Sequence, residues 1–182
     1  MIAMPLFDTA DVYVRPIRLS DVPAWYSYLS IPSVIEHTSW NLSSENDLQK
    51  LVMSYLANEA ESPIRFAIVD KVSDNLVGTI GFHTLSSANL SAELAYDIHP
   101  SFWGKGIATD VAKGMVNWGH SIRGFFRIQA CALDTNVASM RVLEKCGFRQ
   151  EGKLRNLRIV RGVPRDCFLY SIIPKPRMQN ER

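Results

Sequence analysis

Two glycines flank a lysine where a strand pattern gives way to a helix pattern, and this arrangement suits an anionic ligand. Gly104-Lys105-Gly106 precedes a helical repeat of apolar residues that runs through Val111, Met115 and Trp118. Glycines let the backbone approach a ligand closely, and the first amides of a helix have no intrahelical acceptor and carry the positive end of its dipole. The segment therefore predicts a turn that binds a phosphate-bearing ligand.

Two familiar phosphate-binding motifs are excluded. The chain has no G-x-x-x-x-G-K-[ST] pattern, and Thr109 stands where the third glycine of the dinucleotide fingerprint falls. Taken alone, the glycine turn is equally consistent with an ordinary tight turn.

Carboxylates near this turn supply groups for proton transfer. Glu93 and Asp97 share one face of a strand expected over Ser91–Ile98, because side chains alternate along a strand. A carboxylate on a central strand is unusual as plain core, although membership of an ion pair is an alternative. His83 and His99 are further candidates, since imidazole exchanges protons near neutrality. We favour Glu93 as the general base.

The elements that must position these groups form a mixed α/β pattern. Pro16 fits an edge strand, because proline cannot donate to a ladder. A strand–helix–strand unit is expected from the strand at 91–98, the helix after Gly106 and the strand from residue 127, and such a unit requires a parallel or crossover pair. Strands are expected at residues 13–19, 64–69, 76–83, 91–98, 127–132 and twice after Phe148, with a turn around residues 161–164 and the last strand at 168–173.

Helix starts are predicted from capping residues. They fall at Ser20, at the capping box Ser44-Glu45-Asn46-Asp47, after Gly106, and at Asp134/Thr135. Gly147 ends the last helix, as a C-cap glycine does.

Length and composition indicate a single domain. The 182 residues are 47% apolar and 21% charged, which is sufficient for one core, and we expect residues 1–182 to form one domain with an ordered core over about 12–173. No apolar run reaches the roughly 20 residues of a membrane helix, and Met1 to Ala10 has neither a basic n-region nor a sustained apolar h-region. We expect a cytoplasmic protein with no membrane partner.

Cysteine spacing and charge exclude further classes. The three cysteines contain no CxxC pair, so we expect neither a disulfide framework nor a metal site. Residues 141–182 hold 11 Lys and Arg against 4 Asp and Glu, which fits an anionic partner or a solvated basic face. We find no RNP-like aromatic strand or glycine clamp, and expect no direct binding of nucleic acid.

Three segments taken together resemble the GNAT N-acetyltransferase superfamily. They are Ala92-Glu93-Leu94-Ala95-Tyr96-Asp97-Ile98-His99-Pro100, Trp103-Gly104-Lys105-Gly106-Ile107-Ala108-Thr109, and Asn136-x-x-Ser139-x-x-Val142-Leu143-Glu144-Lys145-Cys146-Gly147-Phe148. Within the superfamily the chain is most similar to the RimJ/RimL-type ribosomal-protein N-terminal acetyltransferases, over about residues 12–173. The resemblance implies a single mixed α/β domain, with a mostly antiparallel sheet splayed at the acetyl-CoA site and about four flanking helices.

The resemblance implies direct acetyl transfer from acetyl-CoA to a primary amine, typically the N-terminal α-amine of a ribosomal protein. A small-molecule amine acetyltransferase and a non-catalytic acyl-CoA-binding module are the alternatives. The protein is expected to be a monomer or homodimer.

The resemblance also assigns site residues. Ser139 is the expected acid at the leaving sulfur, because Leu143 stands where many relatives carry tyrosine. Glu93 remains the expected base, and no residue is expected to bind metal. The expected acetyl-CoA contacts are Ile98, Trp103, Gly104, Lys105, Gly106, Ile107, Ala108, Thr109, Asn136, Ser139 and Lys145, and the acceptor contacts are Glu36, Trp40 and Asn156.

Overall fold

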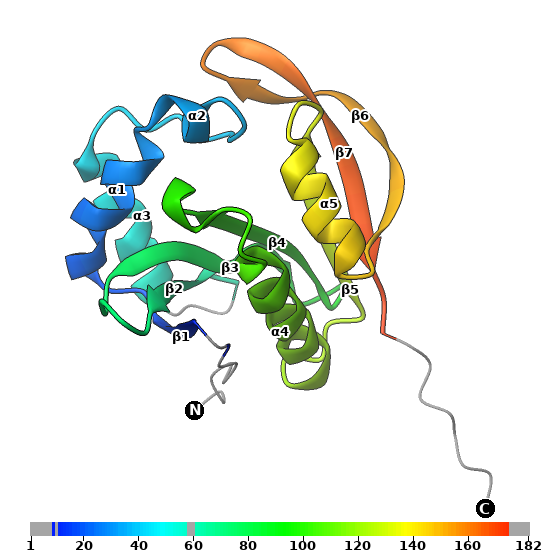
Figure 1. The fold of residues 1–182 in the computed structure, drawn as a ribbon. Coiled ribbons are helices and arrows are strands. Elements are labelled where there is room, and N and C mark those ends of the chain that lie inside the picture. Colours follow the sequence, from blue (N-terminus) through cyan, green and yellow to red (C-terminus); the bar gives the residue numbers. More distant parts are fainter. Residues whose placement is uncertain (1–8, 10, 58–60, 175–182) are drawn as a thin grey trace, which may run out of the picture.

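The computed structural model describes residues 9, 11–57 and 61–174, and within them a seven-stranded sheet carries five α-helices (Figure 1). The strands are β1 Val12–Pro16, β2 Ile64–Asp70, β3 Leu76–Ser86, β4 Ser91–Ile98, β5 Arg127–Leu133, β6 Arg149–Val160 and β7 Val163–Ile172. The helices are α1 Val22–Leu29, α2 Pro32–Ile35, α3 Glu45–Leu56, α4 Ile107–Ser121 and α5 Val137–Lys145, with 3-10 turns at Leu19–Asp21 and Pro100–Phe102.

The sheet order is β1-β2-β3-β4-β5-β7-β6, and every neighbouring pair among these strands is antiparallel except β4 and β5. Helix α4 connects those two parallel strands, as a crossover must. The mixed α/β fold and the edge position of β1 are therefore confirmed, with one more helix than expected because α2 adds a single turn.

β4 and β5 touch over a short stretch. Their pairing covers Ser91↔Arg127, Ala92↔Ile128 and Glu93↔Gln129, and stops there although β4 continues to Ile98. The remainder of β4 has an open edge toward β5, so the sheet is splayed from Glu93 onward.

The two faces of the sheet bury different helices. Trp25, Tyr28, Leu48 and Val52 from α1 and α3 pack on one face, and Val111 and Met115 from α4 pack on the other. The side chains of β4 alternate between these cores: Leu94 and Ile98 join the α4 core, and Asp97 contacts α1.

Two of the predicted caps are wrong. Ser20 lies inside the 3-10 turn, and the neighbouring Asp21 instead accepts from the Arg18 amide at 2.8 Å. Asp134 and Thr135 do not cap α5, because Asn136 Oδ1 accepts from the Ser139 amide at 3.0 Å. The predictions for Asp47, which accepts from the Ser44 amide at 3.2 Å, and for Gly147, with φ of 89°, are confirmed.

The hairpin of β6 and β7 curves over the splayed sheet toward α2 (Figure 1). It turns at Arg161 and Gly162. Asn41 holds its tip, donating to the Ile159 carbonyl at 3.1 Å and accepting from the Arg161 amide at 2.9 Å. The hairpin thereby forms one wall of the space above β4.

Candidate active site

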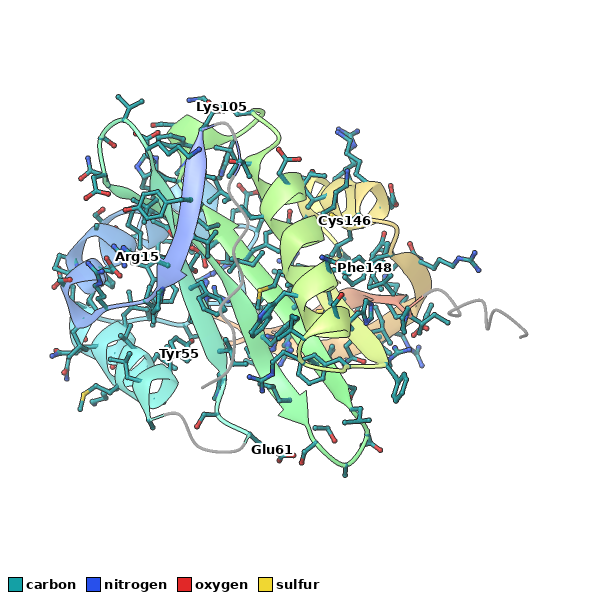
Figure 2. All side chains as sticks on the ribbon, turned by 90° about the horizontal axis from the view of Figure 1, so that it is seen from below. Arg15, Tyr55, Glu61, Lys105, Cys146 and Phe148 are labelled. Carbon is teal, nitrogen blue, oxygen red and sulfur yellow. The ribbon has the colours of Figure 1, made fainter. Side chains whose placement is uncertain are left out.

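The glycine turn has the geometry of an anion-binding loop. Gly104 and Gly106 have φ of 76° and 83°, and a Cβ added to either meets no atom within 4 Å, so their backbone faces open space. Gly106 precedes α4, and Figure 2 shows Lys105 beside that helix start. The amides of Ile107 and Ala108 lie in the first turn, where a helix has no internal acceptor for them. These residues fit a phosphate group.

The end of α5 lies beside the start of α4. The Cys146 thiol contacts the Thr109 carbonyl at 3.5 Å, which brings the last turn of α5, containing Lys145, to the first turn of α4. Lys145 is exposed, and Lys105 is exposed with its Nζ 4.4 Å from the Phe102 ring centroid. Both cations are accessible to a solvated phosphate.

The open edge of β4 presents backbone groups. The backbone amide of His99 donates to the Val77 carbonyl at 2.8 Å, and Ile98 is the register partner of Gly78. In an antiparallel pair this pattern turns the N–H and C=O of Ile98 away from β3. Trp103 Nε1 donates to the Ile98 carbonyl at 2.7 Å, which fixes the turn to the strand end and leaves the Ile98 N–H facing the open edge.

A cavity of about 420 Å³ opens where β4 and β5 separate. Residues of β2 to β7, α3 and α5 line it, together with the loop before α3, so it reaches from α3 to the hairpin wall. The lining side chains used below are Trp40, Arg65, His83, Glu93, Tyr96, Cys131, Asn136, Ser139, Arg158 and Cys167.

Glu93 is buried in this cavity with polar neighbours. Its carboxylate receives Gln129 Nε2 at 3.2 Å and Arg158 Nη2 at 3.1 Å, and His83 Nε2 lies 3.2 Å away. Burial by itself raises the pKa of Glu93, but the hydrogen bonds from His83 and Gln129 and the charge of Arg158 outweigh it. The pKa of Glu93 is therefore lowered, and the group is a carboxylate at neutral pH.

Two strand irregularities direct the partners of Glu93 into the cavity. The β3–β4 register slips between Phe82 and Thr84, so His83 occupies a bulge beside Glu93. The β6–β7 register slips between Leu154 and Arg158, which leaves Arg158 facing Glu93. Sequence patterns did not reveal Arg158, because no local signal shows that the end of β6 lies beside Glu93 on β4.

Ser139 lies in the cavity at the beginning of α5. Its Oγ is 2.9 Å from the Tyr96 hydroxyl, and its amide is held by Asn136. Asn136 also donates through Nδ2 to the His37 carbonyl at 2.9 Å, so its side chain ties α5 to the loop after α2 and keeps one amide hydrogen for a ligand. Leu143 is fully buried, 1% exposed, and does not face the cavity.

Asp97 serves a different purpose from Glu93. Trp25 Nε1 at 3.0 Å and the Tyr28 hydroxyl donate to Oδ1, while Arg65 Nη2 at 2.6 Å and Thr79 Oγ1 at 2.7 Å donate to Oδ2. Arg65 is itself 6% exposed. These donors saturate the carboxylate, so Asp97 is a structural ion-pair member and not an alternative base. His99 is likewise outside the cavity and accepts from the Ser101 amide at 3.1 Å.

Of the three predicted acceptor residues, one lines the cavity and two do not. Trp40 lines the cavity, packed edge-on against Trp25 with ring centroids 5.8 Å apart. Glu36 and Asn156 do not line it. The Glu36 side chain is 71% exposed, and Asn156, with φ of 53°, lies in the β6 bulge with its amide donating to Asp166. The bulge that excludes Asn156 is the one that places Arg158 in the cavity.

The cavity thiols are poor nucleophiles. Burial first, and then the charge of Glu93, raise the pKa of Cys131 to about 12, and burial raises that of Cys167. Both therefore remain thiols at neutral pH, which favours direct attack by an amine over an acyl-cysteine intermediate. Within residues 9, 11–57 and 61–174, no three His, Cys, Asp or Glu side chains gather closely enough to hold a metal ion.

Comparison with known proteins decides the family. The GNAT acetyltransferase domain model matches residues 11–149. The chain belongs to the GNAT acetyltransferase family. The N-acetyltransferase YoaA of Bacillus subtilis, itself uncharacterized, is 34% identical over 175 residues, 95% of this chain and 98% of that one. A spermidine N(1)-acetyltransferase of Vibrio cholerae is 26% identical over 111 residues, 61% of this chain and 62% of that one.

Solved GNAT structures have the same fold. The ribosomal-protein-S5-alanine acetyltransferase from Vibrio fischeri superposes with a TM-score of 0.80, at 22% identity over 93% of this chain and 97% of that one. Family membership makes this protein an N-acetyltransferase with acetyl-CoA as its donor. The helices found among the described residues include none long and apolar enough to span a membrane.

Proposed function

We propose that the protein acetylates the N-terminal α-amine of a protein, with a cytoplasmic ribosomal protein as the expected substrate class. The charge of the cavity carries this proposal. Glu93 is the one carboxylate among the described lining residues, whereas two cations, Arg65 and Arg158, also line the cavity. A polyamine would bring two or more positive charges to these cations, while a polypeptide terminus brings a single amine and neutral peptide groups.

The surroundings of Trp40 support a polypeptide. Trp40 also borders a second cavity of about 400 Å³, lined by Tyr26, Leu42 and Arg161 among others. This space gives the residues that follow an acceptor terminus an apolar surface with one cation. A small amine would leave this second cavity unfilled.

The proposed chemistry assigns three tasks. Glu93 takes the proton that the amine loses, directly or through a water molecule. The Ile98 N–H donates to the thioester oxygen as negative charge develops there, because it is fixed before reaction. As the new N–C bond forms, the C–S bond breaks and its electron pair leaves with sulfur, which receives a hydrogen bond from Ser139.

The test measures CoA release from acetyl-CoA with N-terminal peptides of ribosomal proteins, the same peptides blocked at their N-termini, spermidine and other small amines. We expect turnover of free peptides, none of blocked peptides, and little of spermidine. Turnover confined to small amines would contradict the acceptor assignment. Acetyl-CoA binding by calorimetry without any turnover would instead favour a non-catalytic module.

A further inference from the structure

Tyr96 places a phenol beside Ser139, and nothing in the family assignment uses it. The Tyr96 hydroxyl lies 2.9 Å from Ser139 Oγ and 3.2 Å from the Ser139 carbonyl oxygen. Tyr96 extends from the part of β4 that has left β5, while Ser139 lies in the first turn of α5. Both residues line the cavity. The contact therefore joins β4 to α5 in the region where β4 and β5 have separated.

The hydrogen bonds between Tyr96 and Ser139 can be arranged in two ways, which differ in the acceptor of the Tyr96 proton. A tyrosine and a serine hydroxyl each have one proton. If Tyr96 donates to the Ser139 carbonyl, then its oxygen accepts the Ser139 proton, and Ser139 has none left for a substrate. If Tyr96 donates to Ser139 Oγ, the Ser139 proton is free to point into the cavity.

We propose that Tyr96 is the positioning residue that directs the hydroxyl proton of Ser139 toward the departing sulfur. Tyr96 supplies a phenol from β4, whereas the position on α5 at which many relatives carry tyrosine is Leu143 here. This inference rests on the proposed role of Ser139. In the transfer step, Ser139 keeps its proton and donates a hydrogen bond to the thiolate, which takes a proton from water after the C–S bond has broken.

The environment of Tyr96 suits a permanent donor. Burial raises its pKa strongly, more than the hydrogen bond with Ser139 lowers it, so the phenol stays protonated across the working pH range. Within the described residues the Tyr96 hydroxyl bonds to Ser139, whereas His83 and Arg158 both contact Glu93. The phenol therefore orients Ser139 without ionising.

The experiment is a double-mutant cycle with Tyr96→Phe and Ser139→Ala. The probe is hydroxylamine with acetyl-CoA, followed by CoA release, because this small nucleophile does not depend on the natural acceptor. We expect each single variant to lose about tenfold in kcat, the size of one hydrogen bond, with an unchanged acetyl-CoA Kd. The double variant should be no slower than Ser139→Ala alone.

Two further variants separate positioning from folding. Tyr170→Phe is the matched control, since Tyr170 is 1% exposed and its hydroxyl bonds Gln150 at 3.2 Å outside the cavity. It should leave kcat unchanged. Ser139→Thr keeps a hydroxyl, so Tyr96→Phe should again slow it about tenfold.

The outcomes distinguish a failure of the role of Tyr96 from a failure of the proposed acceptor. Losses that add in the double variant, a Tyr96→Phe enzyme as fast as wild type, a parallel loss in acetyl-CoA binding, or no catalysed reaction with hydroxylamine would overturn the assignment of Tyr96. Catalysis with hydroxylamine but not with peptides would reject the proposed acceptor and leave the Tyr96 result standing.

Discussion

Glu93 and Asp97 leave the same face of β4 and are almost equally buried, 8% and 7% exposed, yet their surroundings differ. Asp97 faces α1 and receives four side-chain donors from packed residues. Glu93 lies where the sheet opens, and its partners border a cavity. Burial and residue type therefore do not identify a functional carboxylate. The proposal for Glu93 rests instead on the accessible space beside its carboxylate.

The largest effect is expected from Asp97→Asn. The new amide would place a donor against Arg65 and leave that guanidinium, 6% exposed, without a negative partner. We expect the free energy of unfolding to fall by about 3–5 kcal/mol. Urea unfolding monitored by circular dichroism checks this, and a loss no larger than that of Glu93→Gln would break the contrast.

Glu93→Gln should damage the reaction and spare the fold. Without the carboxylate the amine proton has no acceptor at the site, so kcat should fall about 100-fold or more while the acetyl-CoA Kd is kept. Steady-state kinetics with the best peptide acceptor and calorimetry measure the two quantities. A pH–rate profile identical in shape and height to that of wild type would remove Glu93 from the role of base.

Tyr28→Phe tests the Asp97 network one donor at a time. The substitution keeps the ring in the α1 core and deletes its hydrogen bond to Asp97. We expect a loss of about 2 kcal/mol in unfolding free energy, because the bond is charge-assisted and buried, with kcat unaltered. Thermal unfolding and kinetics on one preparation decide it; a kcat defect at full stability would link Asp97 to chemistry after all.

Arg158→Met is the corresponding single change at Glu93. The pKa of Glu93 is lowered in the folded protein, so its carboxylate persists below its usual range and its contribution disappears as pH falls through the folded value. Removing the charge of Arg158 raises that pKa, and the acidic limb of the kcat/KM profile should move to higher pH. The shift should stay below about one pH unit, since the Arg158 side chain is 39% exposed and screened.

The profile over the acidic range measures this shift, with stability followed in parallel. Lys153→Met is a suitable control, because that side chain pairs with Asp166 at 2.8 Å and does not line the cavity. A limb that moves to lower pH in Arg158→Met would refute the electrostatic role.

Local signals predicted much of this fold. The bounds of β4 follow from alternation and from Pro100, and the turn at Gly104 and Gly106 follows from glycine chemistry. Local signals do not predict which residues far apart in the sequence contact each other. The donors of Asp97 come from α1, β2 and β3, and Arg158 enters the cavity through a bulge. The Asn136 cap was missed because three consecutive residues, Asp134, Thr135 and Asn136, are all good caps.

The three residue pairs that join β4 to β5 are a narrow seam between the two parts of the sheet. Native-state hydrogen exchange detects units that open separately where few contacts join them. We therefore expect β1–β4 with α1 and α3 to exchange as one unit and β5–β7 as another, with the α4 core connecting the two. A donor bound along the open edge of β4 adds contacts across the seam, so saturation with acetyl-CoA should merge two exchange classes into one cooperative unit.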